Sequence, residues 1–379
     1  MQDLRSYLLV AGVAAIVTYL MTPVVRLVAL RLDAVDRPGG RKVHAIPTPT
    51  MGGLAMFFGF LGGLALASRM EVFQPLFLAS GLPGFGPVVV VSEVLGVAIG
   101  AALMVVIGMI DDTMGLTAPA KLAAQICAAS TMTLFGVRVL SFWLPLAGTV
   151  VLSPDLGVPV TVLLIVTTVN AVNLVDGLDG LAAGLVGIGA LAYFIYSYRI
   201  GATGIIADSS PAALLSGVLF GACVGFLPHN FNPARIFMGD SGSMLLGTLL
   251  SGATITGIGR SSQPQAGDQF ALLIPVAIPL LVLALPFLDT FLAVGRRVRS
   301  GKGIMTADKN HLHHQLLEIG HSHRKAVLVL WAWSALLASA AVALSFTGPT
   351  RVLPGFLVVV TVGVIALLGP RRRRAGHRT

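Results

Sequence analysis

Four polar side chains interrupt a long apolar stretch near the middle of the chain. Asn170, Asn173, Asp176 and Asp179 stand three positions apart in the sequence NAVNLVDGLDGLAAG. On a helical or near-helical backbone this spacing brings them close to one face. Either aspartate taken alone could simply cap a helix. Four polar residues at one spacing instead favour a functional site.

Two adjacent carboxylates, Asp111 and Asp112, end another apolar run. Neighbouring acids at a membrane edge repel each other, so such a pair usually needs a cation. Mg²⁺ suits hard oxygen ligands and typically takes one or two carboxylates together with substrate phosphates and water. Lys121 opens the next apolar run. A solvated acidic cap remains the alternative for the aspartate pair.

Two further aspartates mark the second half of the chain. Asp240 precedes the small residues Ser241, Gly242 and Ser243 at the start of an apolar run. It could be an N-cap, but small residues at a helix N-terminus also leave N–H groups free for phosphate oxygens. Asp289 lies within an apolar run, where an ionisable residue is a functional hypothesis by default.

Two polar loops carry the remaining candidates. The segment DRPGGRKVHAIPTPTMGG contains Lys42 and His44, which could hold phosphate, although basic residues there could also serve only membrane topology. The segment ADKNHLHHQLLEIGHSH contains His311, His313 and His314. Clustered histidines suggest a transition metal, but no Cys or Glu partner stands at zinc-site spacing. Contact with pyrophosphate is favoured, with a plain solvated loop left open.

The elements that must position these residues are membrane helices. Hydrophobic residues make up 55% of the 379 residues, charged residues 11%, and the mean hydropathy is +0.89. Continuous apolar runs of about 20 residues predict spanning helices and not a barrel. We therefore predict an all-α polytopic membrane protein, a single domain over residues 1–379 with a basic tail at 371–379. The eleven expected spans are 8–30, 51–68, 88–110, 121–136, 159–175, 180–198, 211–227, 242–258, 270–294, 326–347 and 353–369.

The distribution of Lys and Arg predicts the orientation. With the N-terminus outside and the C-terminus inside, the inner segments hold most of the 25 Lys and Arg residues. The net charge of +9 is then explained by basic residues that set the membrane topology, and it does not indicate nucleic-acid binding. Every even-numbered span begins on the inner face, so several positive helix ends can converge on an anionic ligand there. In a transporter we expect acidic residues at several depths across the membrane, whereas the acidic residues of this chain are expected on one face. A non-catalytic lipid or nucleotide sensor is a further alternative.

Five stretches, taken in order, resemble one enzyme family. DRPGGRKVHAIPTPTMGG, MIDDTMGLTAPAK, NAVNLVDGLDGLAAG, NPARIFMGDSGS and ADKNHLHH are similar to motifs of the polyprenyl-phosphate N-acetylhexosamine-1-phosphate transferases. The nearest resemblance is to the WecA/TagO-type branch. The related MraY-like branch transfers phospho-MurNAc-pentapeptide and typically has three consecutive histidines, where this chain has Leu312 between His311 and His313.

The resemblance implies a Mg²⁺-dependent reaction, with Mn²⁺ as a substitute, at the cytoplasmic face of a bacterial-type cell membrane. GlcNAc-1-phosphate would pass from UDP-GlcNAc to undecaprenyl or decaprenyl phosphate, releasing UMP. Asp240 would bind the metal with Asp112 and Asp176, Asp111 and Asp112 would manage the acceptor phosphate, and the three histidines would contact the diphosphate. The implied substrate-binding residues are Lys42, His44, Lys121, Asn170, Asn173, Asp176, Asp179, Asn232 and Asp289. Membrane lipid is the expected surrounding, nucleic acid is not a partner, and a homodimer is left open.

Overall fold

Helices make up most of the described chain. A computed structural model describes residues 4–38, 46–77, 80–81, 90–144, 148–202, 210–257, 277, 280 and 322–347. The helices within these ranges are α1 (Leu4–Arg31), α2 (Gly52–Ala67), α3 (Gln74–Phe77), α4 (Glu93–Met114), α5 (Ala118–Leu134), α6 (Pro154–Val175), α7 (Leu181–Ala202), α8 (Pro211–Asn230), α9 (Gly239–Gly257) and α13 (His323–Thr347).

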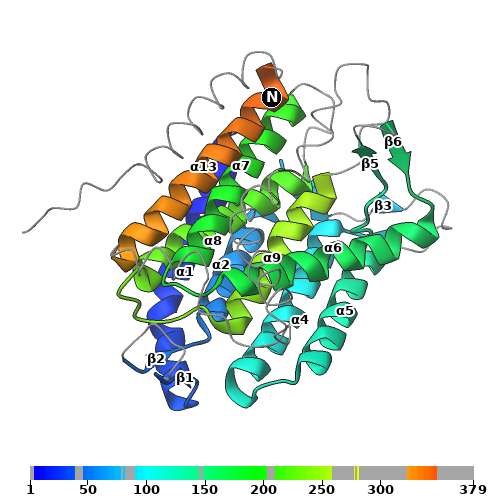
Figure 1. Cartoon of the computed structure of the whole chain (residues 1–379). Coiled ribbons are helices and arrows are strands. Elements are labelled where there is room, and N and C mark those ends of the chain that lie inside the picture. The colour runs from blue at the N-terminus through cyan, green and yellow to red at the C-terminus, as the bar shows by residue number, and fades with distance from the viewer. Residues whose placement is uncertain are drawn as a thin grey trace, which may run out of the picture.

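Short antiparallel strand pairs join some of the helices. β1 (Val35–Asp36) pairs with β2 (Thr48–Pro49), β3 (Ser80–Gly81) with β4 (Val90–Val91), and β5 (Ser141–Leu144) with β6 (Gly148–Val151). The sequence between 137 and 158, apolar but broken by prolines, predicts a short hairpin or interfacial segment, and β5 and β6 confirm the hairpin. In Figure 1 this hairpin lies at the opposite end of the helices from β1 and β2.

The predicted spans match helices over most of the described residues, but the start of span 88–110 is wrong, because Val90 and Val91 form β4 and α4 begins at Glu93. Spans 270–294 and 353–369 lie outside the described residues, apart from positions 277 and 280. Among the described residues, six helices are long and apolar enough to cross a membrane: α1, α4, α6, α7, α8 and α13. The helix α2 is apolar but shorter. The all-α polytopic membrane class is therefore confirmed, whereas the count of eleven spans and the orientation stay predictions.

Local sequence signals set several helix ends. Ser92 precedes α4, and its hydroxyl accepts a hydrogen bond from Leu95 N at 3.3 Å, an N-cap. Ser210 caps α8 in the same way through Ala212 N at 3.2 Å, with Pro211 as the first helical residue. At its other end, α4 stops at Gly115, whose φ of +73° favours glycine. The helix therefore ends at Met114, two residues after the aspartate pair.

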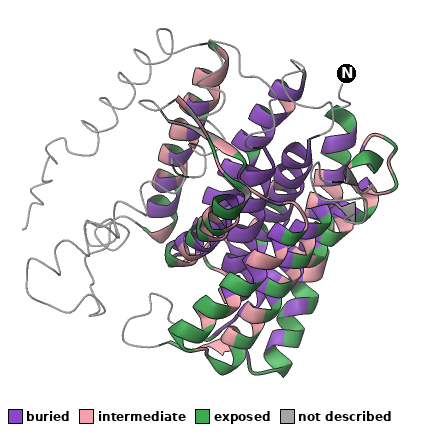
Figure 2. Ribbon diagram, turned by 90° about the vertical axis from the view of Figure 1, so that its right-hand side faces the viewer, coloured by how far each residue is buried: buried purple, intermediate pink, exposed green. Residues whose placement is uncertain are grey.

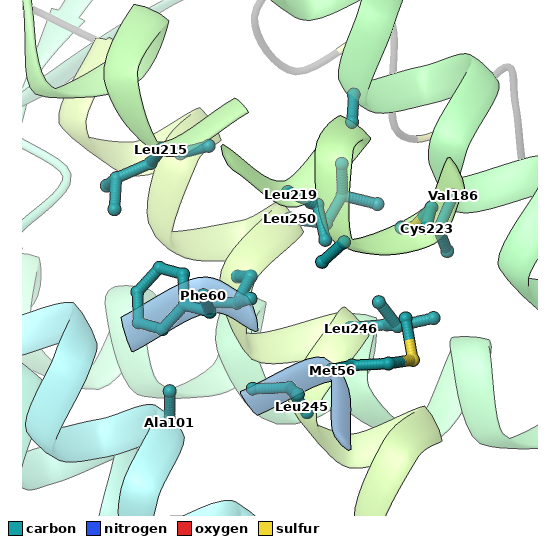
Figure 3. Packing of buried hydrophobic residues seen from close by; sticks show 14 of the residues in the cluster. Met56, Phe60, Ala101, Val186, Leu215, Leu219, Cys223, Leu245, Leu246 and Leu250 are labelled. Atoms are coloured by element: carbon teal, nitrogen blue, oxygen red, sulfur yellow. The ribbon is translucent and has the colours of Figure 1, made fainter. Parts of the chain in front are cut away.

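The core is centred on α9. Every residue of α9 from Ser241 to Gly257 is buried, and Figure 2 shows the buried residues gathered in the central helices. Figure 3 shows Met56 and Phe60 of α2 packed beside Leu246 and Leu250 of α9. Burial on all sides explains why α9 is neither strongly amphipathic nor lipid-facing. Its burial therefore fixes the position of its N-terminus, where Asp240 lies.

Small residues allow the helices to approach closely around α9. A Cβ at Gly53 of α2 would collide with the backbone at Gly242, and one at Gly247 would collide with the backbone at Val169. Close approach through glycine is typical of membrane helix packing. The helix α1 lies at the periphery and exposes apolar side chains such as Ile16 (60% exposed) and Leu27 (58% exposed). Its outer face therefore suits lipid.

Candidate active site

The N-terminus of α9 is capped by a carboxylate from another helix. Asp112, at the end of α4, accepts hydrogen bonds from Asp240 N at 2.8 Å, Ser241 N at 3.2 Å and Ser241 Oγ at 2.8 Å. The Thr50 hydroxyl adds a fourth at 3.3 Å. Free N–H groups and the positive end of the helix dipole both favour an anion at this position. Asp112 therefore fixes the backbone of the first turn of α9, at Asp240 and Ser241.

The segment before α9 is also held by α2. Phe237 N donates to Pro49 O at 2.8 Å, Gly52 N to Phe237 O at 2.9 Å, and Gly53 N to Met238 O at 3.0 Å. Gly239 then turns with φ +69°, and a Cβ there would collide with Thr50 Oγ1 and the Asp112 carboxylate. Glycine is thus required both by the backbone conformation and by the lack of space.

A lysine joins two of the predicted carboxylates. Lys121 Nζ lies 2.8 Å from Asp111 Oδ2 and 2.8 Å from Asp240 Oδ1. The side-chain amide of Asn173 also donates to Asp240 Oδ1 and, at 2.8 Å, to Ser243 Oγ. We call Asp111, Asp112, Lys121, Asn173 and Asp240 the Asp240 cluster. It brings together the C-terminal ends of α4 and α6 with the N-terminal ends of α5 and α9, so the expected convergence of helix N-termini holds here for α5 and α9.

The expected shared face of Asn170, Asn173, Asp176 and Asp179 is only partly correct. The helix α6 ends at Val175, so the two aspartates lie in the turn before α7. Asn170 donates to Gln125 Oε1 at 2.7 Å and to Val166 O at 2.8 Å. Its amide therefore bonds the neighbouring helix α5, while Asn173 one turn later bonds Asp240.

Asp179 and Asn232 bond to each other. Asp179 Oδ2 accepts from Asn232 Nδ2 at 2.9 Å and from Ala234 N at 3.1 Å. The next residue in the turn, Gly180, donates its N–H to Asn230 Oδ1 at 3.0 Å. These bonds join the turn after α6 to the segment between α8 and α9.

Asp176 differs from its neighbours because its carboxylate has no hydrogen-bond or ion-pair partner among the described residues. It is partly buried. Burial, followed by the negative charges of Asp240, Asp112 and Asp179, raises the pKa of Asp176 to about 8. A group that resists ionisation beside other acids is one that a bound cation would stabilise in its charged form.

The donor set fits Mg²⁺ in part. Within the described ranges no group of three or more His, Cys, Asp or Glu side chains is arranged to hold a metal. Mg²⁺ does not need such a group, because it commonly takes one or two carboxylates, with substrate phosphates and water completing the shell. Among the described residues, Asp176, whose carboxylate has no partner there, and Asp240, whose charge acts on it, are best suited to that role. The two oxygens of Asp112 already accept four hydrogen bonds, which orient α9.

Several predicted site residues lie outside the described residues, and their predictions stand as made: Lys42, His44, Asp289, His311, His313 and His314. Sequence reasoning missed two side chains in the described part. Gln125 follows Lys121 by one helical turn, a spacing that could have placed both on one face of α5. Asn230, at the end of α8, gives no signal in the sequence that separates it from an ordinary helix terminus.

Comparison with known proteins finds relatives that cover nearly the whole chain. A family model described as glycosyl transferase family 4 matches residues 94–258. A decaprenyl-phosphate N-acetylglucosaminephosphotransferase of Mycobacterium tuberculosis is 44% identical over 98% of this chain and 90% of the relative. A probable undecaprenyl-phosphate N-acetylglucosaminyl 1-phosphate transferase of Bacillus subtilis is 33% identical over 95% and 91%. A phospho-N-acetylmuramoyl-pentapeptide-transferase of Desulforudis audaxviator is 35% identical over 87% and 96%. The chain therefore belongs to the polyprenyl-phosphate GlcNAc-1-phosphate transferase family.

Proposed function

We propose that this protein transfers GlcNAc-1-phosphate from UDP-GlcNAc to a polyprenyl phosphate, undecaprenyl or decaprenyl, and releases UMP. The observation that carries the proposal is the Asp240 cluster, in which Lys121 bridges Asp111 and Asp240 at the capped end of α9. The names of the Mycobacterium and Bacillus relatives support the donor sugar and the lipid acceptor. The reaction would be the first membrane step of a cell-envelope glycan pathway.

The reaction makes an electrostatic demand that the residues of the Asp240 cluster, three carboxylates and one lysine, would meet only together with a bound cation. A phosphate oxygen must attack another phosphate, so negative charge has to be neutralised. Lys121 supplies a cation between two carboxylates, and Asn173 holds Asp240 Oδ1 in place. Bound Mg²⁺ would supply further charge neutralisation on the diphosphate. Asp176 and Asp240 are the residues that would hold it, because the carboxylate of Asp176 has no hydrogen-bond or ion-pair partner in the described part of the chain.

We propose direct displacement by the acceptor phosphate. The second pKa of a phosphate monoester is about 6, so the acceptor is largely dianionic at neutral pH. Asp111 would position the acceptor or take its remaining proton. Both of its oxygens already have partners, Lys121 at 2.8 Å and Leu116 N at 2.6 Å, which favours positioning over nucleophilic attack. A phosphorylated enzyme trapped with UDP-GlcNAc in the absence of lipid would instead support a covalent aspartyl-phosphate route.

The experiment is UMP release by the purified protein. It is given Mg²⁺, a polyprenyl phosphate and, separately, UDP-GlcNAc, UDP-GalNAc or UDP-MurNAc-pentapeptide, with Asp240→Asn as the control. Release with UDP-GlcNAc alone, dependent on lipid and lost in the variant, supports the proposal. Release with the pentapeptide donor would support the MraY-like alternative, which the Desulforudis relative keeps open. No release from folded protein with any donor overturns the transferase assignment.

The location of the site is part of the proposal. We place the Asp240 cluster at the cytoplasmic face of the plasma membrane, because the basic segments of the sequence favour an outside N-terminus. Asp155 is an exposed residue near the opposite end of α6 from Asn173. The thiol of an Asp155→Cys variant should then react with an impermeant reagent added to intact cells. Labelling only after cell lysis would contradict this orientation.

A further inference from the structure

The start of α13 contacts the site through two consecutive side chains. His323 Nε2 accepts a hydrogen bond from Asp179 N at 3.1 Å, and Arg324 Nε donates to Asn232 O at 2.7 Å. These contacts connect residues separated by 144 and 92 positions in the chain. We call His323 and Arg324 the α13 latch.

The latch acts on two segments that are already joined. Asn232 Nδ2 donates to Asp179 Oδ2 at 2.9 Å and Ala234 N donates to the same oxygen at 3.1 Å, so two hydrogen bonds join the turn after α6 to the segment before α9. The latch adds one bond to the backbone of each segment. The turn carries Asp176, and the segment leads into Gly239 and Asp240. The latch thus holds the backbone of the turn that carries Asp176 and the backbone of the segment that leads into Asp240.

The contacts of His323 are specific. Asp179 N–H and Gly180 N–H are consecutive donors, and each is fixed by a side chain from a different helix, His323 from α13 and Asn230 from α8. To accept this bond, His323 must carry a lone pair on Nε2 and hold its proton on Nδ1. If α13 only packed against α7, its first residue would not need to accept a hydrogen bond from Asp179 N.

The body of α13 gives the latch a fixed base. Trp331 packs over Gly184 of α7, where a Cβ would collide with the indole ring. Its ring lies 5.6 Å from that of Phe231, the residue before Asn232. The helix is therefore seated against α7, which follows the turn that His323 bonds, and against the segment that Arg324 bonds.

We propose that His323 and Arg324 are positioning residues for the nucleotide-sugar site, because they hold Asp176 and Asp240 at the separation that the donor and its cation require. This inference rests on the proposed function, which assigns the donor to that place. It predicts that loss of the latch weakens donor binding selectively. In the proposed reaction Asp111 positions the lipid acceptor, and its partners are Lys121 and Leu116 N, neither of which belongs to the latch.

The test compares variants that differ in one property. His323→Leu removes the acceptor, whereas His323→Gln keeps a side-chain oxygen that can accept. Arg324→Ala removes the second bond, and Lys325→Gln removes a neighbouring exposed charge as the control. KM for UDP-GlcNAc, KM for polyprenyl phosphate and kcat are measured for each, together with UDP binding by calorimetry in the presence of Mg²⁺ and without lipid.

The expected result is a rise of about tenfold in the donor KM and in the Kd for UDP for His323→Leu and Arg324→Ala, the scale of one or two hydrogen bonds. The KM for lipid stays within about twofold, and His323→Gln and Lys325→Gln stay near wild type. Unchanged donor KM and Kd in His323→Leu would overturn the inference, as would equal losses for donor and lipid. If the wild type releases no UMP but binds UDP in a latch-dependent way, the proposed function fails and the latch stands.

Discussion

Asp112 and Ser241 share two hydrogen bonds, from the backbone N–H of Ser241 at 3.2 Å and from its hydroxyl at 2.8 Å. The two residues are 129 positions apart in the chain. An N-cap normally comes from the residue before the helix, but here α4 supplies it to α9. The last turn of one helix therefore fixes the first turn of another, and Asp240 lies between them.

We expect Asp112→Ala to lower the free energy of unfolding by about 2 kcal/mol or more, because it removes a cap and leaves buried donors unsatisfied. Thermal unfolding in detergent measures the change. Asp155→Ala is the matched control, since Asp155 is likewise an acidic residue at a helix N-terminus, in the first turn of α6, but is exposed. Its replacement should change stability by no more than about 0.5 kcal/mol. Equal shifts for the two variants would show that Asp112 does not cap α9.

Two glycines with positive φ allow a second matched comparison. Gly239 has φ +69° and Gly115 has φ +73°, but a Cβ at Gly239 would meet Thr50 and Asp112 whereas one at Gly115 meets nothing within 4 Å. Gly115→Ala should therefore cost only the backbone strain, about 1–3 kcal/mol. Gly239→Ala should cost more and should also abolish UMP release, because it displaces the cap. Comparable activity in both variants would contradict this account of Gly239.

The sequence predicts the helices well because each one depends on a continuous apolar run, which is a local property. The type and spacing of Asp111, Asp112, Asn173 and Asp240 also predict a site, since polar residues at membrane helix ends are costly without a role. What the sequence lacks is the partner of each group. Asp112 is expected at a cation, but its four hydrogen bonds come from Thr50 and the start of α9.

The same limit applies to Asp179. Spacing alone groups it with Asn170 and Asn173, whereas the structure gives its carboxylate to Asn232 and its N–H to His323. These partners lie 53 and 144 positions away. Helical periodicity reports on neighbours within one element, and it carries no information about which loop of another element lies opposite. Tertiary packing therefore determines that Asp179 hydrogen-bonds to neighbouring segments of the protein.

Lys121 should contribute mainly to the reaction. We expect Lys121→Met to lower kcat for UMP release by about 10²–10³-fold, the effect typical of removing one preorganised electrostatic contact. The variant also leaves Asp111 and Asp240 facing each other without the cation between them. Steady-state kinetics with saturating donor and lipid measure the loss.

Lys325→Met is the control for the loss of Lys121. It removes an exposed lysine at the start of α13 and should leave kcat within about twofold, because surface substitutions usually have small effects. A loss below about threefold in Lys121→Met would mean that the lysine serves the fold and not the chemistry.

Asp176 gives a prediction about pH. Burial and the neighbouring carboxylates raise its pKa to about 8 in the folded protein, against about 3.9 for an unfolded aspartate. Between these values the folded chain holds a proton that the unfolded chain has released, so the free energy of unfolding falls as pH rises. In EDTA the contribution is therefore fully present below about pH 4 and is lost as pH rises through about 8.

The measurement is the apparent Tm in detergent from pH 5 to pH 9, with EDTA or with Mg²⁺, for the wild type and Asp176→Asn. The wild type should lose more Tm with rising pH than the variant, because the amide that replaces the carboxyl group does not titrate. A cation that binds the ionised carboxylate stabilises the folded state by mass action. Mg²⁺ should then restore Tm at pH 9 in the wild type and much less in Asp176→Asn. The same pH slope in both proteins would show that Asp176 is ionised throughout, and equal Mg²⁺ shifts would place the cation elsewhere.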